Sequence, residues 1–251
     1  MSRPSVLITG AAKRIGAEIA RHFGANGWHV VVHYNHSRDA AEALAAELPS
    51  AQSVSCDLAQ SGAGLGMIED LAARLDDWRV LINSASIFPP DAVTDLSPDV
   101  FSEVMQVNAK APVRMAQAFL RSARAKTGRR VIQITDQKIA NPNPDFFSYT
   151  MSKHALAATI PMMGMAADGD DRIYGLAPGA ILPSHDQTAE EAETSHRMNL
   201  LHRRTGAEEV AEAALFLAQG WLASGQTLFV DSGQHLVPQT RDVLYLARET
   251  A

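Results

Sequence analysis

The chain nearly lacks cysteine, since Cys56 is the only one among its 251 residues. A single cysteine excludes an internal disulfide and is typical of proteins from reducing compartments. Cys56 falls within a strand-like run, so we interpret it as a small buried hydrophobe rather than as a nucleophile.

Positive charge and long apolar runs are also scarce. Lys and Arg number 22 against 28 Asp and Glu, for a net charge of −6, which removes the electrostatic case for nucleic acid or an anionic membrane surface. The longest apolar stretch, 155–167, is interrupted by Pro161 and Gly164 and is shorter than the ~20 residues of a membrane span. The N-terminal residues lack the pattern of a signal peptide. We expect a soluble, cytoplasmic protein, and no metal site is predicted.

What the chain does contain is a regular alternation of strand-like and helix-like segments. Seven apolar runs predict strands at 5–9, 28–33, 52–56, 79–83, 130–135, 172–176 and 226–230. Six amphipathic or alanine-rich stretches predict helices at 17–23, 39–48, 66–75, 97–118, 149–167 and 207–218. We therefore predict an α/β fold of one domain over residues 1–251, a Rossmann-type, doubly wound, parallel, seven-stranded sheet with helices on both faces.

Two segments fall outside this alternation. Residues 184–204 are polar and charged without a clear period, which is typical of a mobile lid over a site. The tail 237–251 contains Leu244-Tyr-Leu246, so we expect it to pack on another surface, for which a neighbouring subunit's site is one candidate.

The first strand runs into a glycine-containing turn, Gly10 to Gly16, and then into a helix. Free backbone N–H groups and the helix dipole at such a turn face an anion such as a phosphate. Gly10 permits the tight turn, and Gly16 permits close packing of helix on sheet. An ordinary strand-to-helix turn is the alternative, and two glycines alone do not exclude it.

The second predicted strand lacks an acidic residue at its end. Such a residue accepts the adenosine ribose hydroxyls of NAD, whereas this chain continues as His33-Tyr-Asn-His-Ser-Arg38. Histidine, serine and arginine can bind the 2′-phosphate of NADP, as can Lys13 and Arg14 in the preceding turn. We therefore predict NADP. Asp57, after the third strand, has two interpretations of equal weight, an acceptor for the adenine amino group or a turn residue.

Tyr149 and Lys153 are four residues apart and therefore lie on one face of the predicted helix. An ammonium beside the phenol favours its ionised form and lowers a pKa that starts near ~10. A phenol tuned in this way can act as a general acid. Taken alone, the pair is more often a solvated surface pair, so the rest of the chain decides its role.

Two other positions, Asn108 and Phe88, remain open to two interpretations each. Asn108 in an apolar helix face is either a water anchor or a structurally satisfied amide. Phe88, in a proline-bounded loop, belongs to the core or stacks on a planar substrate. The small residues after Asn83 allow a cofactor to approach the backbone.

Together these pieces resemble the short-chain dehydrogenase/reductase family over nearly the whole chain. The resemblance is carried by Thr9-Gly10…Gly16, Asp57-Leu58, Asn83-Ser-Ala85, Asn108, Tyr149…Lys153, Pro178-Gly179 and Val-Asp-Ser-Gly233. It implies that Tyr149 is the general acid, that Lys153 binds the nicotinamide ribose and lowers the phenol pKa, and that Asn108 holds a relay water. It also implies that Pro178-Gly179 flanks the nicotinamide, and that the protein is a homo-oligomer, such as a tetramer or dimer.

Departures from the family pattern are similar to its pteridine reductase branch, which includes the dihydromonapterin reductases. Arg14 replaces a glycine, Asp136 replaces the usual catalytic serine thirteen residues before the tyrosine, and Ser86 and Phe88 replace the usual sequence after Asn83. The resemblance implies that Arg14, Ser86, Phe88, Asp136 and Tyr149 bind substrate. An ionised carboxylate would repel a developing alkoxide, whereas it suits a substrate with N–H donors.

The predicted catalytic residues are Tyr149, Lys153, Asp136 and Asn108. The predicted cofactor-binding residues are Gly10, Arg14, Ile15, Gly16, His33, Tyr34, Asn35, His36, Ser37, Asp57, Leu58, Asn83, Ser84, Ala85, Thr135, Tyr149, Lys153, Pro178, Gly179 and Ile181. The hypothesis is that NADPH reduces a C=N bond of a dihydropterin, such as dihydromonapterin or dihydrofolate. The alternatives are an NADPH-dependent carbonyl or 3-oxoacyl reductase and a non-catalytic NADP-binding regulator.

Overall fold

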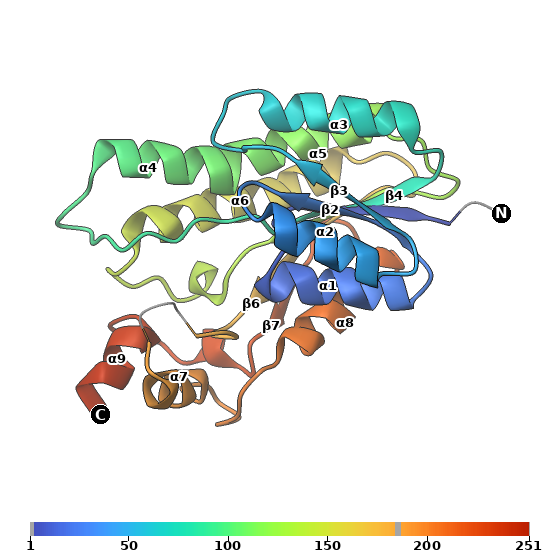
Figure 1. Cartoon of the computed structure of the whole chain (residues 1–251). Helices are drawn as coiled ribbons and strands as arrows, with labels where there is room; N and C mark the ends of the chain where they lie inside the picture. The colour runs from blue at the N-terminus through green and yellow to red at the C-terminus, as the bar shows by residue number, and fades with distance from the viewer. Residues whose placement is uncertain (1–2, 184–186, 251) are drawn as a thin grey trace.

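A computed structural model describes residues 3–183 and 187–250 and contains one seven-stranded parallel sheet with strand order β3-β2-β1-β4-β5-β6-β7 (Figure 1). The strands are β1 (Ser5–Ile8), β2 (His29–Tyr34), β3 (Ala51–Ser55), β4 (Trp78–Asn83), β5 (Arg130–Ile134), β6 (Arg172–Pro178) and β7 (Thr227–Val230). All six neighbouring pairs are parallel. The predicted parallel α/β fold is confirmed, and each strand lies within two residues of its expected bounds.

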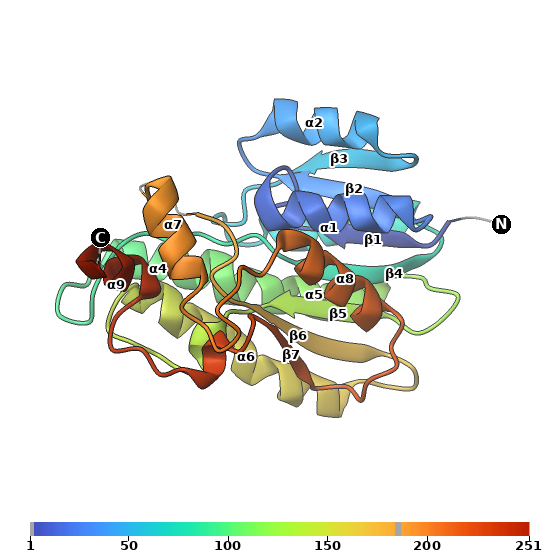
Figure 2. The same cartoon turned by 90° about the horizontal axis from the view of Figure 1, so that it is seen from below.

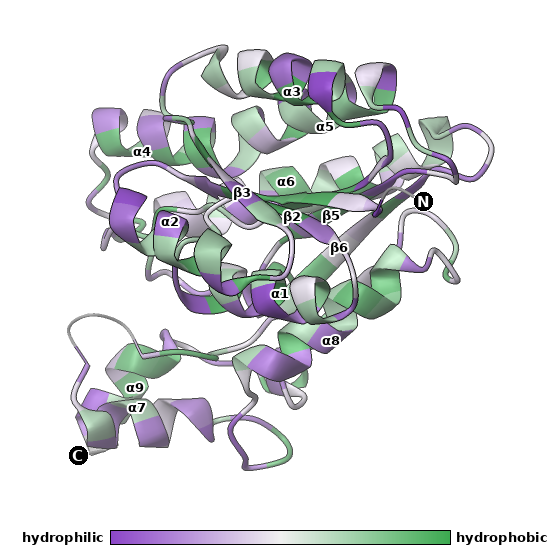
Figure 3. Ribbon diagram, turned by 45° about the vertical axis from the view of Figure 1, so that its right-hand side comes forward, coloured by the Kyte–Doolittle hydropathy of each residue, from purple (hydrophilic) through white to green (hydrophobic). Residues whose placement is uncertain are grey.

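Helices cover both faces of this sheet (Figures 1 and 3). One face carries α1 (Arg14–Ala25), α2 (Arg38–Glu47) and α8 (Ala207–Ala218), and the other carries α3 (Ala63–Arg74), α4 (Pro98–Met105), α5 (Ala111–Ser122) and α6 (Phe147–Ala166). The central strands β1 and β4 are buried along almost their whole length, so they supply apolar side chains to both helical layers.

The strand order reverses at β1, whose neighbours are β2 on one side and β4 on the other. Crossovers leave to opposite faces at this point, and a crevice opens beyond the carboxyl ends of the strands. The Gly10–Gly16 turn after β1 and the loop after β4 therefore lie together. Backbone contacts confirm it, because the Thr9 hydroxyl accepts hydrogen bonds from the N–H groups of Ser84 and Ala85, both at 3.0 Å.

The helix expected over 97–118 is interrupted. It consists of α4, a π-helical segment η1 (Gln106–Lys110) and α5. One-turn π segments are rare and frequently mark functional sites, and Asn108 lies in the middle of this one.

The expected lid and tail both contain helices that sequence periodicity did not reveal, α7 (Ala189–His196) and α9 (Val243–Thr250). Thr188 and Glu191 form a capping box that starts α7. The two helices lie side by side beyond the end of the sheet (Figure 2). Residues 184–186 of the expected lid lie outside the described residues. Elsewhere, short 3₁₀ helices occur at η2 (Gln137–Ile139) and η3 (Gln234–Leu236).

The tail packs on its own chain rather than only on a neighbour. Leu244 is 5 % exposed and forms a small apolar cluster with Phe146 and Tyr149. The expectation that the tail packs on another surface is confirmed within this chain, and a neighbouring subunit's site stays a prediction. Within the described ranges, the model has no helix that is long and apolar enough to cross a membrane.

Candidate active site

A cavity of about 400 Å³ lies at the carboxyl ends of the central strands. Most of the predicted site residues line it: Gly10, Arg14, Ile15, Gly16, Ser84, Ala85, Ser86, Phe88, Thr135, Asp136, Tyr149, Lys153, Pro178, Gly179 and Ile181. They come from the turn after β1, the loop after β4, the end of β5, the start of α6 and the end of β6. Five separate segments thus converge on one cavity, although nothing in the covalent sequence brings them together.

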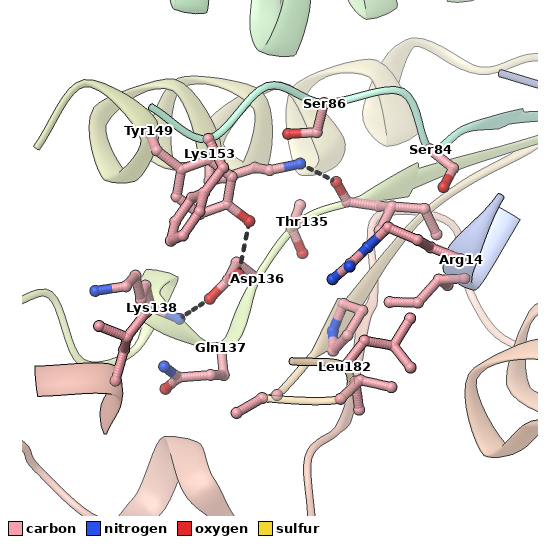
Figure 4. A pocket seen from close by; sticks show the side chains of 18 of the residues that line it. Arg14, Ser84, Ser86, Thr135, Asp136, Gln137, Lys138, Tyr149, Lys153 and Leu182 are labelled. Carbon is pink, nitrogen blue, oxygen red and sulfur yellow. Dashed lines mark hydrogen bonds between the residues drawn. The ribbon is translucent and has the colours of Figure 1, made fainter. Parts of the chain in front are cut away.

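Tyr149 and Asp136 are joined directly. The phenol O–H donates to Asp136 Oδ2 at 2.7 Å, and the Lys138 backbone N–H donates to Asp136 Oδ1 at 2.8 Å (Figure 4). Burial raises the pKa of the Asp136 carboxyl despite these two hydrogen bonds. The pair can therefore store and pass a proton.

Lys153 is buried below Tyr149. Its Nζ donates to the Ile134 carbonyl at 2.8 Å and lies 5.4 Å from the centre of the Tyr149 ring. Burial lowers the Lys153 pKa to about 8. The predicted lowering of the phenol pKa is wrong for this structure, because burial and the neighbouring Asp136 charge raise the Tyr149 pKa well above its ordinary value.

His33 has a structural position instead of a phosphate-binding one. It is 2 % exposed, its Nδ1 accepts from the Gly10 N–H at 3.0 Å, and its Nε2 pairs with the Cys56 carbonyl at 3.0 Å. Burial lowers its pKa to about 4. The imidazole is therefore neutral and buttresses the turn after β1, which corrects its assignment as a cofactor ligand.

Asn108 and Asn83 are also buried beneath the cavity rather than lining it. The Asn108 amide accepts from the Ile87 N–H and donates to the Ile87 carbonyl, both at 2.9 Å, and to Ser152 Oγ at 3.1 Å. This is the satisfied-amide alternative, and it fixes the loop that carries Phe88. Asn83 Nδ2 donates to Gln133 Oε1 at 2.9 Å inside the sheet.

The residues predicted to surround the adenosine differ in their exposure to solvent. His36 and Ser37 line a second hollow with Lys13 and Arg38, whereas Tyr34 and Leu58 are buried in the two apolar cores. Asp57 caps its own turn, since Oδ1 accepts from the Ala59 N–H at 3.0 Å and from exposed Asn35 at 3.2 Å. Of the two roles considered for Asp57, adenine acceptor and turn residue, its Oδ1 has the turn role.

Arg14 occupies an unusual backbone conformation. Its φ is +57°, the left-handed region that favours glycine, and its guanidinium donates to the Pro183 carbonyl at 3.1 Å. Strain of this kind gathers at functional sites. Gly10 has φ +66°, and a Cβ there would lie 2.8 Å from Ala85 Cα, so only glycine fits this turn.

The N-terminus of α1 suits an anionic dinucleotide. Its N-cap Lys13 makes no side-chain cap, its first turn contains no acidic residue, and residues 13–16 line the cavity. Backbone N–H groups, the helix dipole and two basic side chains form the donor set that a diphosphate requires. The residues present therefore fit a nicotinamide dinucleotide, and Lys153 lines the same cavity.

Sequence reasoning missed several cavity residues. Lys138 follows Asp136 by two residues and is 3 % exposed, yet its spacing carries no recognised signal. Asp242, Val243 and Leu244 come from the tail, and Gln187, Ser195 and His196 from the expected lid. Among these residues only Leu244 was indicated by the sequence, because it belongs to the apolar run Leu244-Tyr-Leu246 in a polar tail.

The comparison with family models decides the family. A model described as enoyl-(acyl carrier protein) reductase, of the short-chain alcohol dehydrogenase type, matches residues 10–235. The chain belongs to the short-chain dehydrogenase/reductase family. Enzymes of this family are NAD(P)H-dependent oxidoreductases, so the expected dinucleotide cofactor is confirmed for the family to which the chain belongs.

Relatives of two kinds are similar over almost the full chain. A solved structure of alternative dihydrofolate reductase 1 (FolM) from Brucella canis, complexed with NADP, has a TM-score of 0.88 and 31% identity, covering 95% of this chain and 96% of that chain. Pteridine reductase 1 from Leishmania tarentolae is 28% identical, over 93% of this chain and 96% of the relative. A putative ketoacyl reductase of granaticin polyketide synthesis from Streptomyces violaceoruber is 26% identical, over 93% and 97%.

Proposed function

We propose that this protein is an NADPH-dependent reductase that adds a hydride and a proton across a C=N bond of a dihydropterin. The observation that carries the proposal is the 2.7 Å hydrogen bond from Tyr149 to Asp136. In its ionised form a carboxyl group at this place is unsuited to a ketone, whose oxygen becomes negative in the transition state. It suits a ring nitrogen that must gain a proton and a heterocycle that presents N–H donors.

The proton moves through the chain's own groups. When bound, NADPH supplies the hydride for the ring carbon. Tyr149 donates its phenolic proton to the neighbouring ring nitrogen, and the protonated Asp136 returns a proton to the phenolate oxygen at 2.7 Å. Burial favours the neutral, proton-carrying form of Asp136. Lys153, buried beneath the phenol, stabilises the negative charge that develops on it.

Phe88 gives the cavity a flat, apolar surface. Its ring packs edge-on against Tyr149 with the ring centres 4.5 Å apart, and 37 % of the residue is exposed. A planar heterocycle beside Tyr149 would contact this ring, and aromatic pairs of such geometry contribute about 0.5–1.5 kcal/mol beyond area burial. The named pterin reductases among the relatives support the same substrate class.

NADP is proposed over NAD because the second hollow is basic. Lys13 and Arg38 line it together with His36, Ser37 and one carboxylate, Asp39. The acidic residue expected of NAD enzymes directly at the end of β2 is missing. Arg38 closes the polar run whose histidine, serine and arginine were predicted to bind the 2′-phosphate. The NADP in the similar Brucella structure supports this choice.

A carbonyl or ketoacyl reductase is the second candidate, because a polyketide ketoacyl reductase is similar over 93% of the chain. The two candidates differ in what they require at position 136. A ketone needs a hydroxyl donor toward its oxygen, so Asp136→Ser would raise ketone reduction in that case. The dihydropterin proposal expects Asp136→Ser to lower pterin turnover.

The test is NADPH oxidation by the purified protein with dihydrobiopterin, dihydromonapterin, dihydrofolate and an acetoacetyl thioester as separate substrates, repeated with NADH. We expect pterin turnover with NADPH. We expect Tyr149→Phe to lower kcat by about 10²–10⁴-fold, the usual contribution of a positioned general acid. Asp136→Ala removes the proton donor behind Tyr149 and should also abolish most turnover.

The matched control is Tyr174→Phe. Tyr174 is another buried tyrosine whose hydroxyl donates to the Leu222 carbonyl at 2.6 Å, away from the cavity, so its loss tests the effect of removing a buried hydroxyl alone. Parent-like kcat in this control is expected. Undiminished pterin reduction in Tyr149→Phe or Asp136→Ala would refute the proposed chemistry.

A further inference from the structure

Residues 241–250 of the C-terminal tail, called the C-terminal segment here, contribute Asp242, Val243 and Leu244 to the lining of the cavity that holds Asp136, Tyr149 and Phe88. We propose that the C-terminal segment is the specificity-determining wall of the substrate site, and that it favours a compact dihydropterin over one with a long extension. The substrate in this inference rests on the proposed function. Three sets of contacts within the same chain carry it.

The first contact is a buried ion pair between Lys138 and Asp242. Lys138 Nζ lies 2.8 Å from Asp242 Oδ2, and the two side chains are 4% and 11% exposed. The same ammonium donates to Asn143 Oδ1 at 2.8 Å. Since the Lys138 backbone N–H also holds Asp136 Oδ1, one residue ties the C-terminal segment to the proposed proton donor. Removing one member of such a pair leaves an uncompensated buried charge, so the contact is costly to open.

The second contact joins the C-terminal segment to the start of the catalytic helix. Asp145 Oδ2 accepts from Arg241 Nε and from the Asp242 backbone N–H, both at 2.8 Å. Asp145 lies two residues before α6, which begins at Phe147 and carries Tyr149. The C-terminal segment is therefore fixed to both sides of the Tyr149–Asp136 pair.

The third contact is a row of aromatic rings. Phe146 stacks on Phe88 with centres 4.0 Å apart and on Tyr245 with centres 5.8 Å apart, each at an interplanar angle of 18°. Leu244 packs on Phe146 and Tyr149 from the same helix α9. The ring proposed to contact the substrate is thus supported, through Phe146, by a ring of the C-terminal segment.

These contacts give the C-terminal segment a role in substrate choice. Asp242, Val243 and Leu244 contribute directly to the cavity lining, next to Lys138 and Asp136. A two-ring pterin with a short side chain needs only the part of the cavity beside the contacting rings of Phe88 and Tyr149. A dihydrofolate carries a long aromatic extension, which meets this wall if it is directed toward α9. The wall therefore lowers the relative efficiency for the extended substrate.

The experiment compares the parent with Asp242→Asn, Tyr245→Ala and a chain ending at Thr240. For each, kcat and KM are measured with dihydrobiopterin and with dihydrofolate, and the NADPH Kd is measured by nicotinamide fluorescence. In Asp242→Asn and Tyr245→Ala we expect a higher KM and a kcat/KM for dihydrobiopterin lower by about 100-fold, the cost of misplacing a reacting group by about 1 Å. The dihydrofolate-to-dihydrobiopterin ratio of kcat/KM should rise by about tenfold, as when a small pocket contact is lost. The NADPH Kd should stay at the parent value.

Glu249→Gln is the matched control, because this exposed residue lies on the same helix and makes a long, 3.8 Å ion pair with Arg241. It should keep the parent KM and the parent ratio. If the shortened chain fails to fold, the two point variants still decide the matter. If the Asp242→Asn and Tyr245→Ala proteins fold and keep the parent KM and the parent ratio of kcat/KM values, the proposed role of the C-terminal segment is wrong.

The proposed function fails separately from this inference. A parent that reduces the acetoacetyl thioester but neither pterin overturns the dihydropterin proposal. The same variants are then measured with the thioester, where a raised KM at constant NADPH Kd supports the wall and an unchanged KM overturns it.

Discussion

At the scale of single residues, burial rather than pairing sets the protonation of the site. It raises the pKa values of Asp136 and Tyr149 and lowers those of Lys153 and His33. In each case water is withdrawn from the charged form, which disfavours that form. Burial therefore favours the neutral forms of Asp136 and Tyr149, whereas Lys153, with a pKa of about 8, keeps its charge at pH 7. The turn after β1 rests on an uncharged imidazole.

His33 makes the stability of the protein depend on pH in a defined window. Its pKa is about 4 in the folded chain against 6.5 for the free side chain. A lowered folded pKa gives a contribution that is fully present above pH 6.5 and is lost as the pH falls toward 4. From His33 alone we expect the free energy of unfolding to decrease by about 2 kcal/mol between about pH 7 and pH 5. Urea unfolding at the two pH values measures it.

His33→Gln isolates this contribution from those of other groups. A glutamine amide can accept from the Gly10 N–H and donate to the Cys56 carbonyl, but it does not titrate. The loss of stability between pH 7 and pH 5 should therefore be smaller in the variant by about 2 kcal/mol. Equal losses in parent and variant would show that His33 is not held neutral by burial.

At the scale of elements, the π-helical segment η1 connects two parts of the site. It places Asn108 opposite Ile87, one residue before Phe88, and within 3.1 Å of Ser152 on α6. An extra residue in a helical turn shifts the register of side chains that follow. The Asn108 amide can then bond the loop after β4 and Ser152 on α6 at once.

Asn108→Ala tests this connection. The substitution leaves the Ile87 N–H and carbonyl without their partner, and each buried group left unpaired costs about 1–3 kcal/mol. We expect a lower urea midpoint and a higher substrate KM, because the loop that carries Phe88 loses its anchor. Ser102→Ala on α4 removes an exposed hydroxyl that bonds only its own helix at 2.7 Å and should change neither quantity. A parent-like KM in Asn108→Ala would show that the contacts of η1 do not affect substrate binding.

The regular elements were predictable because their apolar residues repeat with the period of a strand or helix. Helices α7 and α9 were not, since few of their residues face a core and their neighbours come from distant parts of the chain. Motifs fixed the positions of Tyr149, Lys153 and Asp136, while the actual partners of His33 and Lys138 depend on tertiary contacts. The spacing of two residues along a sequence indicates whether they lie on the same face of a helix or strand, but not whether water reaches them. Burial is the main cause of every pKa shift described at this site.

At the scale of the whole molecule, the sheet separates two apolar cores that the same strands fill. Trp28 belongs to the core under α1 and α8, and Trp78 to the core under α3 and α5. Alternate side chains of β1 enter opposite cores, for example Ile8 and Leu7. Neither core can lose its packing without exposing strands that the other requires, which supports the proposal of one domain.

One domain predicts one unfolding transition seen equally by both tryptophans. The chain has three tryptophans, and Trp221 is 73% exposed, so Trp221→Phe combined with Trp78→Phe or Trp28→Phe leaves a reporter in one core only. Because each variant also changes stability, each is compared with its own circular dichroism midpoint in urea. For a cooperative domain the fluorescence and dichroism midpoints should coincide in both proteins. A reporter that unfolds at a lower urea concentration than its own backbone signal would divide the molecule into two cooperative units at the sheet.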